Sequence, residues 1–272
     1  FALEGLEQLD LGNLANQNLN GSSAYEAREG YVGKLNYDYD NKYLLEFSGR
    51  YDGSYKLPTA TRFAFFPAVS VGWVMNRESW FNVPAVDNLK LRASWGESPD
   101  DEPLSGGQFY LGYNYGGGSY VFNPGSLTAG LNPNVEPNYI LTYSKSRITN
   151  IGFDAGLFNN LLTLNVDAFY RKRSGLPATR ASISIPSTAG ISLPQENLNS
   201  DEIRGFEIAL TYNKTINDFS FSIAPNISYK QARNVHIEQS PFNSQWSNFL
   251  GNTINRNKNI LIGYDYAGQF QT

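Results

Sequence analysis

The sequence contains no cysteine, and it has a single histidine, His236, among its 272 residues. Without cysteine, the chain can form neither a disulfide framework nor a zinc site built on thiolates. No stretch approaches 18 consecutive apolar residues, which excludes a transmembrane helix. The formal net charge is −4, so we expect no basic surface for nucleic acid. A transmembrane β-barrel stays possible, because half of the residues in its strands are polar.

The sequence also lacks the motifs of common enzymes. A histidine-based triad would depend on His236 alone, and no G-x-S-x-G, H-E-x-x-H or P-loop motif is present. Residues 116–119 are Gly-Gly-Gly-Ser without a following lysine, and the acidic residues 100–102 lack calcium-loop spacing. We interpret the first as a flexible loop tip and the second as a solvated acidic loop. We therefore expect no catalytic residue, no metal and no cofactor.

The sequence does contain segments in which apolar and polar residues alternate with a period of two residues. In LLTLNVDAFYRKR, residues 161–173, Leu162, Leu164, Val166 and Ala168 alternate with polar residues. This alternation is typical of a strand with two chemically different faces. Helical periodicity is nearly absent, although a short helix is possible in residues 76–88. The same alternation recurs in residues 31–40, 43–52, 63–75, 88–95, 150–158, 161–170, 205–213 and 219–230.

The connections between these segments alternate in length. Asp40-Asn41-Lys42, Asn159-Asn160 and Asn217-Asp218 are expected to be tight turns, because Asn and Asp tolerate left-handed backbone conformations. The other connections are long: 53–62, 96–149, 171–204 and 231–259. An up-and-down antiparallel barrel with tight turns at one rim and long loops at the other produces this pattern.

In these eight segments, every charged residue lies on only one of the two faces that the alternation defines. Asp38, Glu46, Arg92 and Asp167 illustrate this charged phase, and the other face is the apolar phase. A soluble sandwich would also separate charges from its core, so this pattern leaves both folds open. Tyrosine and tryptophan near the strand ends, together with long loops on one side, favour the membrane barrel. In that fold the apolar phase contacts lipid and the charged phase lines the lumen.

Several stretches resemble the SusC/RagA-like TonB-dependent outer-membrane transporters. The most similar are LNYDYDNKYLLEFSGRYDGS at 35–54, FFPAVSVGW at 65–73 and NLKLRASWGES at 88–98. Four further stretches follow in the family's order: LNPNVEPN at 131–138, TNIGFDAGLFNNLLTLNVDAFYRKRSGL at 149–176, EIRGFEIALTYN at 202–213 and GYDYAGQFQT at 263–272. Pro137 and Asn138 depart from the family pattern. Each stretch is weakly specific, but seven in order are a strong signal together.

The resemblance implies an all-β fold, part of a transmembrane barrel of about 22 strands around a plug domain. Residues 1–30 would then form an extracellular loop region, and residues 31–272 part of the barrel. Because the chain begins with Phe1, we interpret it as a processed or truncated piece, without the plug and the last strands. The resemblance also implies the Gram-negative outer membrane, surrounding lipid and a SusD-like surface lipoprotein as lid. It further implies coupling to TonB-ExbB-ExbD through a missing N-terminal region.

Two connections contain aromatic residues suited to binding an oligosaccharide or a peptide. Aromatic rings stack on apolar faces, and neighbouring Asn residues supply directional hydrogen bonds. The same rings could instead pack over the barrel mouth or against a partner. A passive or scaffolding barrel and a soluble carbohydrate-binding module or enzyme remain alternative functions. The candidate substrate-binding residues are Phe109, Tyr110, Tyr113, Tyr115, Tyr120, Phe122 and Trp246.

Overall fold

The computed structural model describes residues 26–133, 135–181, 185, 186, 188, 190 and 192–263. No helix among these residues is long and apolar enough to cross a membrane. Most of the described chain is antiparallel β-structure, which confirms the expected fold class. Its strands are β1 (Arg28–Tyr39), β2 (Tyr43–Ser54), β3 (Phe63–Val74), β4 (Val86–Asp100), β5 (Tyr113–Asn123), β6 (Ser126–Pro133), β7 (Ser144–Leu157), β8 (Leu162–Thr179), β9 (Gln195–Ile216), β10 (Phe219–Ile223) and β11 (Asn226–His236).

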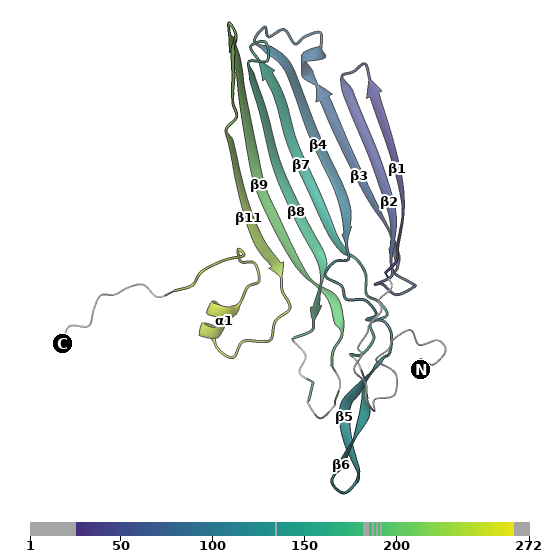
Figure 1. Ribbon diagram of the computed structural model, residues 1–272. Helices are drawn as coiled ribbons and strands as arrows, with labels where there is room; N and C mark the ends of the chain where they lie inside the picture. The colour runs from purple at the N-terminus through teal and green to yellow at the C-terminus, as the bar shows by residue number, and fades with distance from the viewer. Residues whose placement is uncertain are drawn as a thin grey trace, which may run out of the picture.

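Nine of these strands form one curved, open sheet (Figure 1). Its order is β1-β2-β3-β4-β7-β8-β9, after which β10 and then β11 both pair with β9. Strands β5 and β6 form a separate hairpin, which projects from the lower end in Figure 1. Within the described residues, β1 at one edge and β10–β11 at the other do not pair, so the sheet is not closed.

The tight turns and the long connections lie at opposite ends of the sheet, as expected. Asp40 and Asn41 have φ values of 55° and 52°, and Asn159, Asn160 and Asn217 also have positive φ. These left-handed conformations are the ones that Asn and Asp tolerate best in tight hairpins. The turns lie at the upper end in Figure 1, hereafter the turn end, and the hairpin and the long connections lie at the lower end, hereafter the loop end.

The strand register places the apolar positions of the alternating pattern on one face, while a few apolar residues, such as Leu44 and Phe66, lie on the polar face. Because paired residues share a face, a row can be followed from strand to strand. One such row contains no charged residue and runs through Tyr37, Leu45, Val71, Ala93, Ile151, Ala168, Phe206 and Tyr229. A second row, from Tyr39 and Tyr43 to Ile208 and Ile227, is also uncharged.

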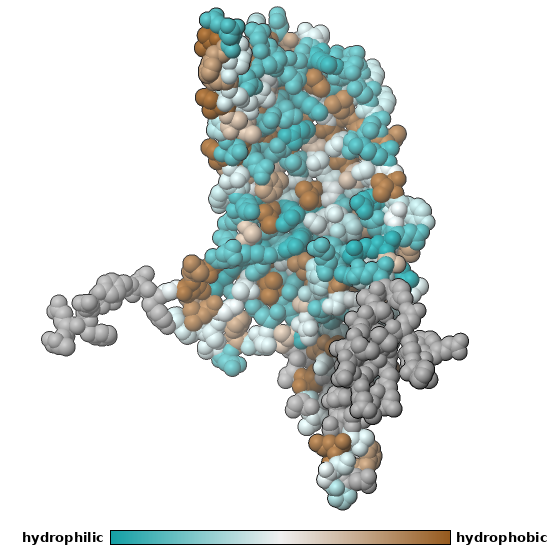
Figure 2. All heavy atoms as spheres, in the orientation of Figure 1, coloured by the Kyte–Doolittle hydropathy of each residue, from teal (hydrophilic) through white to brown (hydrophobic). Residues whose placement is uncertain are grey.

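This apolar face is uncovered in the described part of the chain. Its large side chains are exposed, for example Leu35 at 68% and Val71 at 48%. A soluble sandwich would bury them under a second sheet, and the only other described sheet is the projecting β5–β6 hairpin. An exposed apolar surface of this extent indicates contact with lipid or protein. The face turned to the viewer in Figure 2 is mostly hydrophilic by contrast.

The buried core lies at the loop end rather than within the sheet. It consists of Leu57, Phe66, Leu104, Leu141 and Tyr143, with Leu57 and Leu141 fully buried. The Phe66 and Tyr143 rings meet edge to face, with centroids 5.5 Å apart. Three connections and the beginning of β3 thus pack into a small domain-like cluster. This cluster fixes the position of the loops around it.

The strands extend beyond the predicted segments at the loop end. β4 continues to Asp100, β7 begins at Ser144, and β8 and β9 continue the sheet to Thr179 and Gln195. Burial no longer alternates there, since most residues in the extensions of β8 and β9 are half-buried. In residues 76–88, only the 3-10 turn η2 (Met75–Arg77) is helical, and the helix α1 (Gln245–Gly251) was not predicted. Its capping box, formed by Ser244 and Ser247, is the signal that could have revealed it.

Candidate functional site

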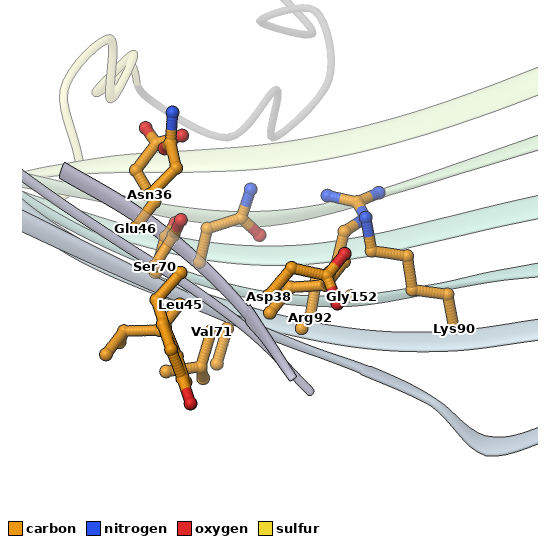
Figure 3. A pocket seen from close by; sticks show the side chains of 15 residues that line it. Asn36, Asp38, Leu45, Glu46, Ser70, Val71, Lys90, Arg92 and Gly152 are labelled. Carbon is orange, nitrogen blue, oxygen red and sulfur yellow. The ribbon is translucent and has the colours of Figure 1, made fainter. Parts of the chain in front are cut away.

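The polar face of the sheet contains a hollow of about 510 Å³ lined by residues of β1, β2, β3, β4 and β7. Figure 3 shows Asn36, Glu46 and Arg92 directed to the opposite side of the sheet from Leu45 and Val71. This is the charged phase of the alternation, so the predicted separation of the two faces is confirmed by the register. The hollow is therefore part of a wet, charged wall.

Arg92 is the centre of a charge network on this polar face. Its Nη1 and Nη2 donate to the two carboxylate oxygens of Asp167 at 2.7 and 2.6 Å. Its Nε donates to Asp154 at 3.1 Å, and the register places Gly152 of β7 between Arg92 of β4 and Asp167 of β8. A Cβ at Gly152 would meet Asp167 Oδ1 at 2.6 Å, so glycine makes room for this network. Charge-assisted, bidentate contacts of this kind hold the wall rigid.

At the loop end, Asp101 connects three segments that are far apart in the sequence. Its carboxylate accepts hydrogen bonds from Ser54 Oγ at 2.6 Å and from Arg28 Nε at 3.1 Å. Lys56 Nζ donates to the Asp101 carbonyl oxygen at 3.1 Å. The interpretation of residues 100–102 as a solvated acidic loop does not hold for Asp101, whose side chain is only 15% exposed. Sequence reasoning missed this role because the partners lie 47 and 73 residues away.

The surroundings shift the pKa values of two groups in this cluster. Burial acts to raise the pKa of Asp101, but the hydrogen bonds from Ser54 and Arg28 outweigh it, so the pKa lies below the ordinary 3.8. Burial, reinforced by the charge of Asp101, raises the pKa of Tyr143 to about 12. At neutral pH, Asp101 is therefore ionised and Tyr143 is a neutral hydroxyl. The cluster has a structural role in holding the loops together.

A second ionic cluster attaches the connection after β11 to the sheet. Asp201, whose side chain is 2% exposed, accepts hydrogen bonds from Arg173 Nε at 2.9 Å and from Lys258 Nζ at 2.5 Å. The backbone of residues 256–258 also bonds to β11, through Asn234 N to Arg256 O and Lys258 N to Ala232 O. The segment therefore pairs with the outer edge of β11.

The predicted binding residues lie at the loop end but form three separate groups. Phe109 is buried against Tyr110, with ring centroids 4.2 Å apart, and Tyr110 is 64% exposed. On the β5–β6 hairpin, Tyr113, Tyr120 and Phe122 are exposed, and Tyr120 and Phe122 are neighbours at 6.2 Å. The side chain of Tyr115 lies outside the described residues.

Trp246 forms the third group, on α1. Its ring stacks on Phe249 at 5.8 Å, and the Arg256 guanidinium lies over Phe249 at 5.6 Å. Figure 1 places α1 well to the side of the hairpin. The structure therefore does not bring Trp246 and the hairpin aromatics into one pocket. A ligand that touched both would have to be extended.

The comparisons with known proteins agree with this architecture. The family model "TonB dependent receptor-like, beta-barrel" matches residues 6–272. The TonB-dependent receptor P3 of Formosa agariphila is 28% identical over 253 residues, which cover 88% of this chain and 24% of that protein. The TonB-dependent receptor SusC of Bacteroides thetaiotaomicron is 28% identical over 214 residues, covering 76% and 21%. The chain spans about a quarter of the length of these relatives.

Among solved structures, the RagAB peptide transporter matches with a TM-score of 0.65 at 21% identity, over 78% of this chain and 23% of that one. The RagAB peptide importer in its 'open-open' state matches with a TM-score of 0.66 at 19% identity, over 84% and 25%. At this identity the likeness concerns the fold, and it agrees with the family match in assigning the nine-stranded sheet to a larger barrel. This chain belongs to the TonB-dependent receptor β-barrel family, a family of outer-membrane transporters rather than enzymes.

Proposed function

We propose that this chain forms part of the wall of a SusC-like importer that moves a nutrient across the outer membrane of a Gram-negative cell. The observation that carries the proposal is the pair of uncharged apolar rows that crosses the sheet with exposed side chains. Such a face suits lipid, and the charged opposite face with its Arg92 network suits a hydrated lumen filled by a plug domain.

The proposed partners follow from the two ends of the sheet. The loop end faces the outside of the cell, where a SusD-like surface lipoprotein covers the barrel and retains the substrate. The turn end faces the periplasm, where TonB-ExbB-ExbD supplies energy through a region of the protein outside this chain. We also propose that residues 1–30 belong to an extracellular loop region, of which 28–30 already form the beginning of β1, and that residues 31–272 belong to the barrel. The barrel performs no covalent chemistry.

The substrate is an oligosaccharide or a peptide that binds at the loop end. The exposed rings of Tyr110, Tyr113, Tyr120, Phe122 and Trp246 are suited to contacting it. Phe109 contributes by supporting Tyr110, and Tyr115 belongs to the same hairpin. Aromatic side chains provide large contact areas at low entropic cost, which suits capture of a passing polymer.

The experiment that tests this function is detergent extraction of the native, full-length protein from outer membranes, followed by native mass measurement. We expect a barrel several times the mass of this chain, together with a co-purifying lipoprotein. Nutrient uptake by the intact cell should stop when a protonophore removes the proton-motive force. Uptake that survives the protonophore would indicate a passive or scaffolding barrel. A protein that stays in solution without detergent would contradict the membrane assignment.

A further inference from the structure

A second hollow, of about 380 Å³, lies at the loop end between the base of the β5–β6 hairpin and the extensions of β8 and β9. Tyr110, Gln108 and Ser105 come from the connection after β4, Thr179 ends β8, and Gln195 begins β9. Its volume falls in the range of about 300–1,000 Å³ that small-molecule sites occupy. The strand extensions that the alternation did not predict thus provide one wall of this hollow.

The described residues that line this hollow carry no charge. Residues 103–135 contain no Asp, Glu, Lys, Arg or His, and the charged residues that follow Thr179 and Gln195, namely Arg180 and Glu196, pair with each other at 2.6 Å. A neighbouring hollow of about 340 Å³ is entirely different, because Arg28, Arg50, Asp52, Asp101 and Glu102 all line it. A charged ligand group placed in the first hollow would lose water without gaining an ionic partner, which is costly. The hollow therefore selects an uncharged ligand.

The polar groups that do line the hollow are arranged as a matched pair. Gln108 Nε2 donates to Gln195 Oε1 at 2.7 Å. Among the described residues, Gln108 Oε1 and Gln195 Nε2 make no further hydrogen bond. The Gln108 carbonyl oxygen can therefore accept a hydrogen bond from a ligand, and the Gln195 amide group can donate one. Asn138 holds the backbones of both residues, through its N–H to Gln108 O at 2.9 Å and its Nδ2 to Gln195 O at 2.6 Å. Adjacent acceptor and donor groups match a hydroxyl group, which both donates and accepts.

Tyr110 forms an aromatic part of the wall, beside the apolar residues Val135, Leu193 and Pro194. Tyr110 is 64% exposed, and its underside packs on buried Phe109. Gly107, with φ of 78°, accepts a hydrogen bond from the Tyr110 backbone N–H at 3.0 Å. Only glycine adopts this conformation without strain, so the turn that presents the ring depends on it. The ring is thus held in place before any ligand arrives, and its face can cover the apolar C–H side of a sugar ring.

From this combination we propose that the hollow is a subsite for one unit of a neutral oligosaccharide, with the sugar ring against Tyr110 and its hydroxyls on Gln108 and Gln195. The inference rests on the proposed importer function and narrows its substrate to an uncharged glycan. It excludes uronic-acid and sulfated glycans from this subsite. A charged terminus or side chain of a peptide would find no ionic partner among the described lining residues, and neutral peptides are compared directly in the test.

The test uses the full-length receptor, purified in detergent with any lipoprotein that accompanies it, on an array of neutral oligosaccharides, galacturonate and sulfated oligosaccharides, and neutral peptides. We expect binding to at least one neutral oligosaccharide, weakened about tenfold or more by Tyr110→Ala. Gln195→Ala should also weaken it. Tyr139→Ala is the matched control, since Tyr139 is a 63% exposed tyrosine that does not line the hollow, and it should leave binding unchanged. Heat-modifiable migration in a gel checks that each variant is folded.

Each result decides the proposal. Binding of neutral oligosaccharides that depends on Tyr110 and Gln195 but not on Tyr139 supports it. Binding only to anionic glycans or to peptides, or neutral-glycan binding that Tyr110→Ala leaves intact, overturns it. So does a lack of binding to every neutral oligosaccharide. In these cases the importer function survives if energy-dependent uptake of another nutrient still requires the receptor, and it fails separately if uptake is independent of the receptor.

Discussion

In the nine-stranded sheet, hydrogen bonds between strands hold a backbone whose large apolar side chains are exposed, whereas at the loop end five side chains are buried together. The sheet has the organisation of a protein whose apolar solvent is lipid, with polar groups paired inside the backbone ladder. The loop end has the organisation of a small water-soluble domain, with a core, ionic clusters and hollows. One chain thus follows two sets of packing rules, and the following substitutions test whether the two regions are independent.

The largest effect is expected from Leu141→Ala in the loop-end core. Leu141 is fully buried, and removing a buried leucine side chain costs about 2–5 kcal/mol. Hydrogen exchange of the full-length protein should show the connections around β5 and β6 losing protection, while β7 and β8 keep theirs. The adjacent Ile140→Ala, at a 77% exposed position, is the control and should change little. Equal loss of protection in the sheet would show that the two regions unfold together.

The next effect concerns the two faces of the sheet. Val69→Arg places a charge on the apolar face, and an arginine near the bilayer midplane costs about 2–4 kcal/mol. Ser70→Arg places the same charge one residue along, on the polar face, where its register partner is Glu46. The free energy of folding of the full-length protein into lipid vesicles should fall for the first variant only. Equal effects of the two substitutions would contradict the assignment of the faces.

A smaller effect is expected where the loop end attaches to the sheet edge. Lys258→Met removes one of the two cations that bind buried Asp201, at a cost of about 1–2 kcal/mol. The backbone amides of Lys258 and Asn234 should then exchange faster, by about 5–30-fold. Lys214→Met, at an exposed position near the turn end of β9, should leave them unchanged. Unchanged exchange in the Lys258 variant would mean that backbone pairing alone holds residues 256–258.

The smallest effect is an acid dependence confined to the loop end. In the folded protein the pKa of Asp101 lies below 3.8, the ordinary value that applies in the unfolded chain. Between the folded pKa and 3.8, the unfolded state therefore binds more protons than the folded state. The stabilisation of the fold by ionised Asp101 is fully present above pH 3.8. As the pH falls through the folded pKa, this contribution is lost, and exchange around Ser54 should accelerate relative to the sheet. Asp101→Asn should be less stable at neutral pH and should lose this acid response. An identical acid response in the variant would assign it to other groups.

The sheet could be predicted from the sequence because its signals are local. Alternation along Leu162, Leu164 and Val166 placed β8, and the positive φ of Asn159, Asn160 and Asn217 confirmed the turns. Strand ends were predicted too short, since most residues in the extensions of β8 and β9 are half-buried and do not alternate. The loop-end contacts could not be predicted, because Asp101 and Asp201 bind residues that are distant in the sequence.

By itself, the sequence determined which faces of the strands are charged, where the hairpins turn, and that the chain resembles the receptor family. The first two properties depend on residues two to four positions apart, and the resemblance depends on the order of short stretches along the chain, so all three can be recognised without knowledge of the fold. Only the tertiary structure decided that Gln108 and Gln195, 87 residues apart, form one hydrogen-bonded pair beside Tyr110. It also separated Trp246 from the hairpin aromatics. The register of β4, β7, β8 and β9 sets these distances, because it fixes where each long connection leaves the sheet.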